Sequence, residues 1–181
     1  EQQRTKQMPG QQPALSTISL IGMPGSGKST VGVLLAKQAG LRFVDTDLDI
    51  QLREGKTLQQ ILESAGYRQL RTIEQEVLLA LDIQRAVIAT GGSVVYSEHC
   101  MERLSAAGPV IYLEAQLDTL QQRVDAAPPR GIASDSGLSY AAIFAERCPL
   151  YQRYASFTVS TQQNDPEQIV AAILDHLQAS A

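Results

Sequence analysis

Short apolar runs alternate along the chain with longer segments in which apolar residues recur at helical spacing. The predicted strands cover 17–22, 41–47, 86–90, 110–115 and 156–160. The predicted helices begin near residues 28, 57, 70, 97, 118 and 166. Because strands that are apolar on both faces belong to sheets covered on both sides, this alternation predicts an α/β fold built on a parallel sheet.

Turn and capping residues refine this pattern. Thr57 and Gln60 form a capping box, which opens a short helix that is predicted to end near Gly66. Residues 1–16 are rich in glutamine and show no periodicity, so we predict a disordered tail. The stretch 126–138 is too polar and too rich in proline to pack regularly, so we predict a loop. Residues 17–181 contain no repeat or linker and are predicted to form a single domain.

Composition narrows the choice of partner and compartment. The chain of 181 residues carries a formal net charge of -4, which argues against nucleic acid or an anionic membrane as a partner. Cys100 and Cys148 lack metal-ligand spacing, and two free thiols in a reducing compartment are favoured over a disulfide. No apolar run approaches the ~18 residues of a membrane span, so a cytoplasmic protein is expected.

A glycine-rich motif stands between the first predicted strand and helix. Gly22, Gly27, Lys28 and Ser29 fit the pattern G-x-x-x-x-G-K-[ST], for which a chance glycine-rich turn is the alternative. Glycines allow successive amide N–H groups to point at phosphate oxygens, and the helix N-terminus adds partial positive charge. We therefore predict a nucleotide whose β- and γ-phosphates contact Lys28 and whose magnesium ion is ligated by Ser29. The predicted nucleotide-binding residues of the motif are Gly25, Ser26, Gly27, Lys28, Ser29 and Thr30.

Two aspartates follow the second predicted strand. Asp45 and Asp47 share one side of the chain if the backbone stays extended, and ligands of open parallel sheets bind at such strand ends. Beside a phosphate loop, Asp45 would help to hold hydrated magnesium and Asp47 would engage an acceptor hydroxyl. The alternative is that one of them caps the next helix. For Asp49, a solvated place in the first turn of that helix is favoured.

Taken together, these motifs resemble those of the shikimate kinase family, from about residue 17 to residue 178. Besides the phosphate loop, that family carries a D-T-D after the second strand, an aromatic-Arg-x-x-Glu on a helix, a glycine triplet, a lid arginine and an R-x-P-L-Y. The corresponding residues here are Asp45-Thr46-Asp47, Leu70-Arg71 with Glu74, Gly91-Gly92-Ser93, Arg130, and Arg147-Cys148-Pro149-Leu150-Tyr151.

The resemblance implies a fold, a reaction and site roles. The fold would be a three-layer P-loop NTPase domain, with a five-stranded parallel sheet and a mobile lid at about 126–138. The reaction would be the ATP- and magnesium-dependent phosphorylation of shikimate to 3-phosphoshikimate, in chorismate biosynthesis. Apart from the resemblance, we expect a monomer. Asp47 and Arg130 would act in catalysis with Lys28. The acceptor would contact Asp47, Arg71, Gly91, Gly92, Arg130 and Arg147, and Arg123 and Pro166 would sandwich the adenine.

Simpler interpretations of the acceptor residues remain open from sequence alone. Arg71 and Glu74 could form an exposed i,i+3 ion pair, although Glu74 could instead orient Arg71 for a carboxylate. Arg147 could be a solvated charge at a helix end, and Gly91-Gly92 could be an ordinary turn.

The chain departs from the family pattern in two places that bear on the acceptor. The lid arginine is followed by Gly131-Ile132-Ala133 instead of Pro-Leu-Leu, which predicts a more flexible lid. Ser93 replaces the third glycine and adds a hydroxyl near the expected acceptor ring. A kinase for another hydroxy acid, such as gluconate, is therefore the first alternative. A nucleotide-binding regulatory module without transfer activity is the second.

Overall fold

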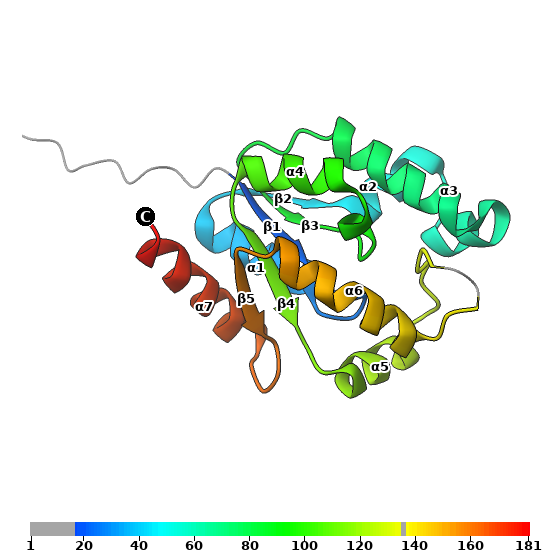
Figure 1. Ribbon diagram of the computed structural model, residues 1–181. Helices are drawn as coiled ribbons and strands as arrows, with labels where there is room; N and C mark the ends of the chain where they lie inside the picture. Colours follow the sequence, from blue (N-terminus) through cyan, green and yellow to red (C-terminus); the bar gives the residue numbers. More distant parts are fainter. Residues whose placement is uncertain (1–16, 135–136) are drawn as a thin grey trace, which may run out of the picture.

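A five-stranded parallel sheet forms the centre of the fold (Figure 1). The computed structural model describes residues 17–134 and 137–181, so the predicted tail and positions 135–136 of the predicted lid lie outside it. The strand order is β2-β3-β1-β4-β5, and every adjacent pair is parallel. The strands are β1 (Thr17–Ile21), β2 (Arg42–Asp45), β3 (Ala86–Ala89), β4 (Val110–Glu114) and β5 (Phe157–Ser160).

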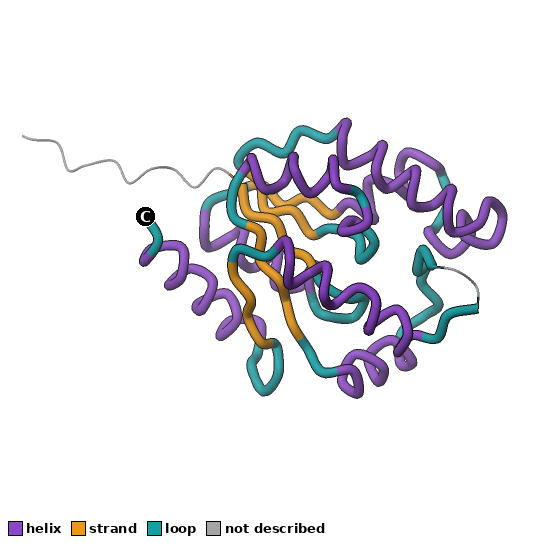
Figure 2. The backbone as a smooth tube through the Cα atoms, viewed as in Figure 1, coloured by secondary structure: helices purple, strands orange, loops and turns teal. Residues whose placement is uncertain are grey.

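Helices cover both faces of the sheet (Figure 2). The buried cluster on one face joins the strands to α1 and α7, and that on the other face joins them to α3, α4 and α6. The helices are α1 (Lys28–Ala39), α2 (Thr46–Glu54), α3 (Leu58–Ala80), α4 (Glu98–Ala107), α5 (Leu117–Ala126), α6 (Tyr140–Tyr154) and α7 (Pro166–Ala179). The predicted three-layer α/β architecture is confirmed. No helix of 17–134 or 137–181 combines the length and apolar character needed to cross a bilayer.

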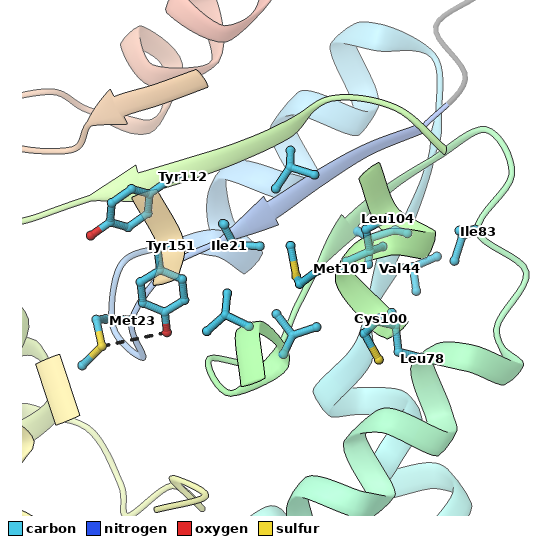
Figure 3. Packing of buried hydrophobic residues seen from close by; sticks show 14 of the residues in the cluster. Ile21, Met23, Val44, Leu78, Ile83, Cys100, Met101, Leu104, Tyr112 and Tyr151 are labelled. Carbon is cyan, nitrogen blue, oxygen red and sulfur yellow. Dashed lines mark hydrogen bonds between the residues drawn. The ribbon is translucent and has the colours of Figure 1, made fainter. Parts of the chain in front are cut away.

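Successive residues of a strand enter opposite cores. In β4, Ile111 and Leu113 pack with α1 and α7, whereas Val110 and Tyr112 pack on the other face. Figure 3 shows this second core, where the rings of Tyr112 and Tyr151 stack with centroids 5.2 Å apart. A strand that is buried on both faces reads as a continuous apolar run, which explains why the pattern identified the sheet.

Local signals set several element boundaries as predicted. Thr57 and Gln60 form the reciprocal capping box at the start of α3. Gly66, at φ 83° and ψ 168°, interrupts this helix, so the predicted break is present. The second predicted strand is too long, because α2 begins at Thr46 and the strand ends at Asp45.

Helix α6 is not among the elements predicted from the pattern. Pro149 stands inside it, and an interior proline normally ends a helix. Ile143, Arg147 and Tyr151 nevertheless recur at four-residue spacing and are all buried. The arginine in this otherwise apolar stripe and the proline concealed the helix in the sequence.

A third, smaller core lies between α2 and α3 and includes one residue from beyond α5. It consists of Ile50, Ile61, Leu70, Ile73, Val77 and Ala133. Leu70 stands where the family pattern has an aromatic residue, and its side chain is fully buried here. This core therefore joins the segment after Arg130 to the two helices that carry the acceptor motif.

We expect Leu70→Ala to lower the free energy of unfolding by about 2–5 kcal/mol, because it opens a cavity in this third core. Leu52→Ala is the matched control, since Leu52 on α2 is 73% exposed and its truncation should cost less than about 0.5 kcal/mol. Urea unfolding of both variants provides the measurement. Equal losses would show that the third core contributes little to stability.

Candidate active site

A cleft of about 490 Å³ lies where the loops after the strands meet. The carboxyl ends of parallel strands share one edge of the sheet, so loops far apart in the sequence converge there. The volume lies within the range of small-molecule sites. The cleft is lined by these predicted site residues: Gly25, Ser26, Gly27, Lys28, Ser29, Thr30, Asp45, Asp47, Gly92, Arg123, Arg130, Arg147 and Pro166.

The phosphate loop joins β1 to α1 in the expected way. Gly25 and Gly27 have φ of 88° and 94°, in the left-handed region that favours glycine. Lys28 Nζ donates hydrogen bonds to the carbonyl oxygens of Gly22, at 2.8 Å, and Met23, at 3.0 Å. Burial lowers the pKa of Lys28 to about 8, while the negative charge of Asp47 opposes that shift. An anion bound in the loop would favour the charged ammonium and so offset the cost of its desolvation.

Oxygen ligands suited to magnesium lie at the start of α1. Ser29 Oγ donates to Asp45 Oδ2 at 2.9 Å, which brings a hydroxyl and a carboxylate oxygen together beside the loop. Magnesium prefers oxygen ligands and commonly binds through one or two protein groups, with water and phosphate completing its shell. The pair therefore fits the predicted metal position.

The two aspartates at the junction of β2 and α2 occupy different environments. The chain is not extended through both, since α2 begins between them and Asp45 caps that helix by accepting from the Asp47 amide at 3.0 Å. The capping interpretation of Asp45 is thus correct and compatible with the Ser29 contact. Asp47 Oδ1 is buried and has no hydrogen-bond partner in 17–134 and 137–181. Burial, followed by repulsion from Asp45, raises the pKa of Asp47.

Arg147 is a buried cation on α6. Its side chain is only 1% exposed, so it is not the solvated helix-end charge considered above. Arg147 Nη2 and Arg71 Nε both donate to the carbonyl oxygen of Ala133, at 3.0 Å and 2.9 Å. The centroid of the Tyr96 ring lies 4.0 Å from the guanidinium carbon of Arg71 and 5.4 Å from that of Arg147. Two guanidinium groups thus converge on one oxygen acceptor.

Gly92 makes room for Arg147. A Cβ at Gly92 would lie 2.8 Å from Arg147 Nη1 and 3.0 Å from Pro24 Cδ. The carbonyl of Gly92 accepts from Tyr151 Oη at 2.5 Å, one helical turn from Arg147. Gly91 donates its amide to Thr46 Oγ1 at 3.0 Å. These glycines therefore serve close packing as well as a turn.

Glu74 is held by Ser93 rather than by Arg71. Ser93 Oγ donates to Glu74 Oε2, and no ion pair within 4.0 Å joins Glu74 to Arg71 among the described residues. Burial, followed by repulsion from Asp47, raises the pKa of Glu74 to about 8.

Arg71 and Gly91 do not line the main cleft. They line a cavity of about 20 Å³ next to it, and Glu74 and Ser93 line both the cavity and the cleft.

The other end of the cleft carries the residues expected around a base. Arg123 Nη1 donates to the carbonyl of Gly25 at 3.0 Å, and Pro166 is the first residue of α7. Asn164 also lines this end, and its Nδ2 donates to the Ser160 carbonyl at 3.1 Å. Asn164 is not among the site residues predicted from sequence, although its place between the last strand and the last helix could have suggested it.

The segment after Arg130 is packed against α3. A Cβ at Gly131 would collide with the backbone carbonyl group of Leu58, so close approach of two backbones requires glycine here. Gly131 has no positive φ that would explain it by conformational freedom. Ala133 is buried in the third core, 2% exposed. The described part of the predicted lid thus lies over the acceptor arginines.

Two tyrosines of the site were missed from sequence. Tyr96 packs against both acceptor arginines and donates to Glu146 Oε1 at 2.5 Å. Tyr140 Oη donates to the Pro24 carbonyl in the phosphate loop at 2.7 Å. Neither lies in a recognisable motif, and only the folded chain brings Tyr96 to the acceptor arginines and Tyr140 to the phosphate loop.

Comparisons with known proteins agree with this geometry. A family model described as shikimate kinase matches residues 24–178. A shikimate kinase from Mycobacterium avium is 39% identical over 164 residues, covering 89% of this chain and 93% of the relative. A shikimate kinase 2 from an Enterobacter species is 37% identical over 165 residues, covering 88% and 94%. The structure of an Acinetobacter baumannii shikimate kinase in complex with shikimate superimposes with a TM-score of 0.83 and 31% identity, covering 92% of this chain and 94% of that one.

Burial of Glu74 predicts a pH-dependent stability. Its pKa is about 8 in the folded protein and 4.5 ordinarily, so between these values the folded state binds more protons and stability falls as pH rises. Glu74→Gln cannot ionise. We expect the free energy of unfolding of the unchanged protein, relative to that of the variant, to decrease from about pH 5 to about pH 9 in urea titrations. A difference that does not vary with pH would contradict the penalty on the charged carboxylate.

Proposed function

The chain belongs to the shikimate kinase family, and we propose that it transfers the γ-phosphate of ATP to a hydroxyl of shikimate, with magnesium, to form 3-phosphoshikimate. This places its product in chorismate and aromatic amino-acid biosynthesis. The cleft contains both the phosphate loop and the guanidinium of Arg147, which shares the Ala133 carbonyl with Arg71, and this arrangement suits the two substrates.

The buried guanidinium of Arg147 is the observation that carries this proposal. A buried cation is costly unless it is paired, and Arg147 Nε has no hydrogen-bond partner among the described residues. The planar forks of Arg147 and Arg71 match the two oxygens of a carboxylate. An acceptor held there by its carboxylate would extend toward Asp47, whose buried Oδ1 is also unpartnered in the described ranges.

In this proposal the residues position and neutralise the reacting groups. Lys28 exchanges the loop carbonyls for phosphate oxygens and balances their charge. Asp47 Oδ1 accepts the proton of the attacking hydroxyl, and its raised pKa makes it a stronger base than an ordinary aspartate. Magnesium, held through Ser29 and Asp45, would supply further charge neutralisation on the phosphates. Arg130, which lines the cleft near Lys28, would stabilise the transferring group.

The packing of Ala133 implies that the lid moves when the acceptor binds. The Ala133 carbonyl accepts from both arginines that the carboxylate would engage. The carboxylate forms stronger, charge-assisted hydrogen bonds and would displace this carbonyl. We therefore propose that the lid segment, within 126–138, shifts with acceptor binding and carries Arg130 toward the phosphates.

We further propose that the protein acts as a monomer in the cytoplasm, without a nucleic-acid or membrane partner. Its two cysteines are free, as expected in a reducing compartment, and its net charge of -4 disfavours binding to polyanions. Light scattering after size-exclusion chromatography tests the oligomeric state.

The activity is tested by measuring ADP release with shikimate, gluconate, quinate or homoserine as the acceptor, each with and without magnesium. We expect magnesium-dependent turnover with shikimate, and a folded Lys28→Ala protein should lose it because the ammonium that contacts the β- and γ-phosphates in this proposal is gone. Preference for gluconate would favour the alternative kinase. ATP binding without turnover of any acceptor would favour the regulatory module.

Arg147→Ala and Arg71→Ala should each raise the KM for shikimate by at least about tenfold, because each removes a charge-assisted hydrogen bond from a buried site. The KM for ATP should change little, and Arg53→Ala, at an exposed ion pair on α2, is the control. Steady-state kinetics measure both constants. If the KM for ATP rose instead, the two arginines would belong to the nucleotide site.

A further inference from the structure

The side chain of Tyr96 lies against both arginines of the proposed acceptor site. Tyr96 is the last residue of the short 3-10 helix η1 (Val94–Tyr96), which stands between β3 and α4. The guanidinium carbons of Arg71 and Arg147 lie over its ring, 4.0 Å and 5.4 Å from the centroid. Both distances fall within the roughly 6 Å over which the face of an aromatic ring attracts a cation. One neutral side chain therefore faces two positive charges that come from different helices.

The hydroxyl of Tyr96 attaches the ring to α6. Tyr96 Oη donates to Glu146 Oε1 at 2.5 Å, and Glu146 immediately precedes Arg147 on that helix. The side chain is partly buried, yet it lines neither the main cleft nor the small cavity beside it. Tyr96 is therefore placed to influence an acceptor through the arginines, without lining the space that the acceptor would fill.

Arg71 has a second aromatic neighbour on its own helix. The ring of Tyr67, four residues earlier on α3, has its centroid 5.1 Å from the guanidinium carbon of Arg71. Leu70, at the position where the family pattern has an aromatic residue, is instead buried in the third core. Tyr67 and Tyr96 thus provide the aromatic surface around Arg71 in this chain.

The two guanidinium groups need a fixed neighbour besides the Ala133 carbonyl. They carry like charges and both donate to that one oxygen, which the acceptor carboxylate would displace in the proposed reaction. The face of a ring attracts a cation without accepting the N–H groups that lie in the guanidinium plane. The Tyr96 ring can therefore stay in place while the oxygen acceptor is exchanged. Side chains that are already oriented lose less conformational freedom when a ligand binds.

We propose that Tyr96 is a positioning residue for the acceptor: its ring holds the guanidinium groups of Arg71 and Arg147 in the orientation in which they bind the carboxylate of shikimate. The inference rests on the proposed function. Tyr96 does not touch the reacting atoms, and the carboxylate is bound equally in the ground state and in the transition state. Loss of the ring should therefore weaken acceptor binding and leave phosphoryl transfer unchanged.

Tyr96→Leu tests this assignment, because it removes the ring and keeps an apolar side chain. We expect the KM for shikimate to rise about tenfold, while kcat and the KM for ATP change less than about twofold. Steady-state kinetics of the folded variant measure all three constants. An unchanged KM for shikimate, or an equal loss in kcat, would overturn the proposal.

Tyr154→Leu is the matched control at the end of α6. Its ring also faces an arginine, since the guanidinium carbon of Arg153 lies 5.4 Å from the centroid, but neither residue lines the cleft. All three constants should stay within about twofold of those of the unchanged protein. If Tyr154→Leu raised the KM for shikimate as much as Tyr96→Leu, the effect would come from general disturbance of α6, which would refute the assignment.

The conservative variant separates the ring from its hydroxyl. Tyr96→Phe keeps the face toward the arginines and loses only the hydrogen bond to Glu146, so its KM for shikimate should stay within about threefold of the original value. A merely structural role of the Glu146 hydrogen bond would not allow this rescue. A KM as high as that of Tyr96→Leu would assign the effect to the hydroxyl and overturn the role of the ring.

A double-mutant cycle identifies the route of the effect. In the Arg71→Ala background, Tyr96→Leu should raise the KM for shikimate less than about threefold, because only Arg147 is left to be oriented. A tenfold rise in both backgrounds would show that Tyr96 acts on the acceptor by a route other than Arg71, against the proposal.

Failure of the proposed function would be visible separately. If the unchanged protein does not turn over shikimate, the kinase assignment is refuted and so is the acceptor role of Tyr96. The contact between the ring and the arginine is then decided by urea unfolding of the unchanged protein, the two single variants and the double variant. Coupling between Tyr96 and Arg71 is expected there, and strictly additive losses would refute it.

Discussion

The buried charge of Arg147 is the constraint on which the rest of the acceptor site depends. A guanidinium that is 1% exposed requires oxygen acceptors and close packing around it. Gly92 provides the space, the ring of Tyr96 lies beside it, and the Ala133 carbonyl accepts one of its hydrogen bonds. Gly92 and Tyr96 are hydrogen-bonded to Tyr151 and Glu146 of the same helix as Arg147, and Ala133 packs in the third core, so the surroundings of the cation are fixed.

Lys28 connects this acceptor half of the site to the nucleotide half. Its ammonium and the carboxylate of Asp47 attract each other, and each charge favours the ionised form of the other. Burial acts in the opposite direction, since it lowers the pKa of Lys28 and raises that of Asp47. Binding of anionic phosphates and an acceptor hydroxyl between them would restore partners to groups that the folded chain has partly desolvated. The cleft is therefore arranged in advance for charged ligands, at some expense of stability.

The lid segment is coupled to the acceptor helices by packing as well as by charge. Gly131 lies directly against the backbone at Leu58, and Ala133 shares a core with Leu70. Sequence considerations attributed Gly131 to flexibility, whereas the structure attributes it to close approach of two chain segments. The substitution of leucine for an aromatic residue at 70 belongs to the same packing unit.

The sequence by itself determined the sheet, its main helices, the phosphate loop and the family. These depend on short-range signals: apolar runs, capping residues such as Thr57, and a motif whose chemistry requires glycine and Lys28 in fixed order. The tertiary structure alone decided the helical state of α6, the end of β2 at Asp45, and the pairing of Glu74 with Ser93 in place of Arg71. A proline and a charged residue within a stripe obscure local periodicity. Which of two neighbouring partners a buried carboxylate takes depends on contacts that form only when distant segments meet.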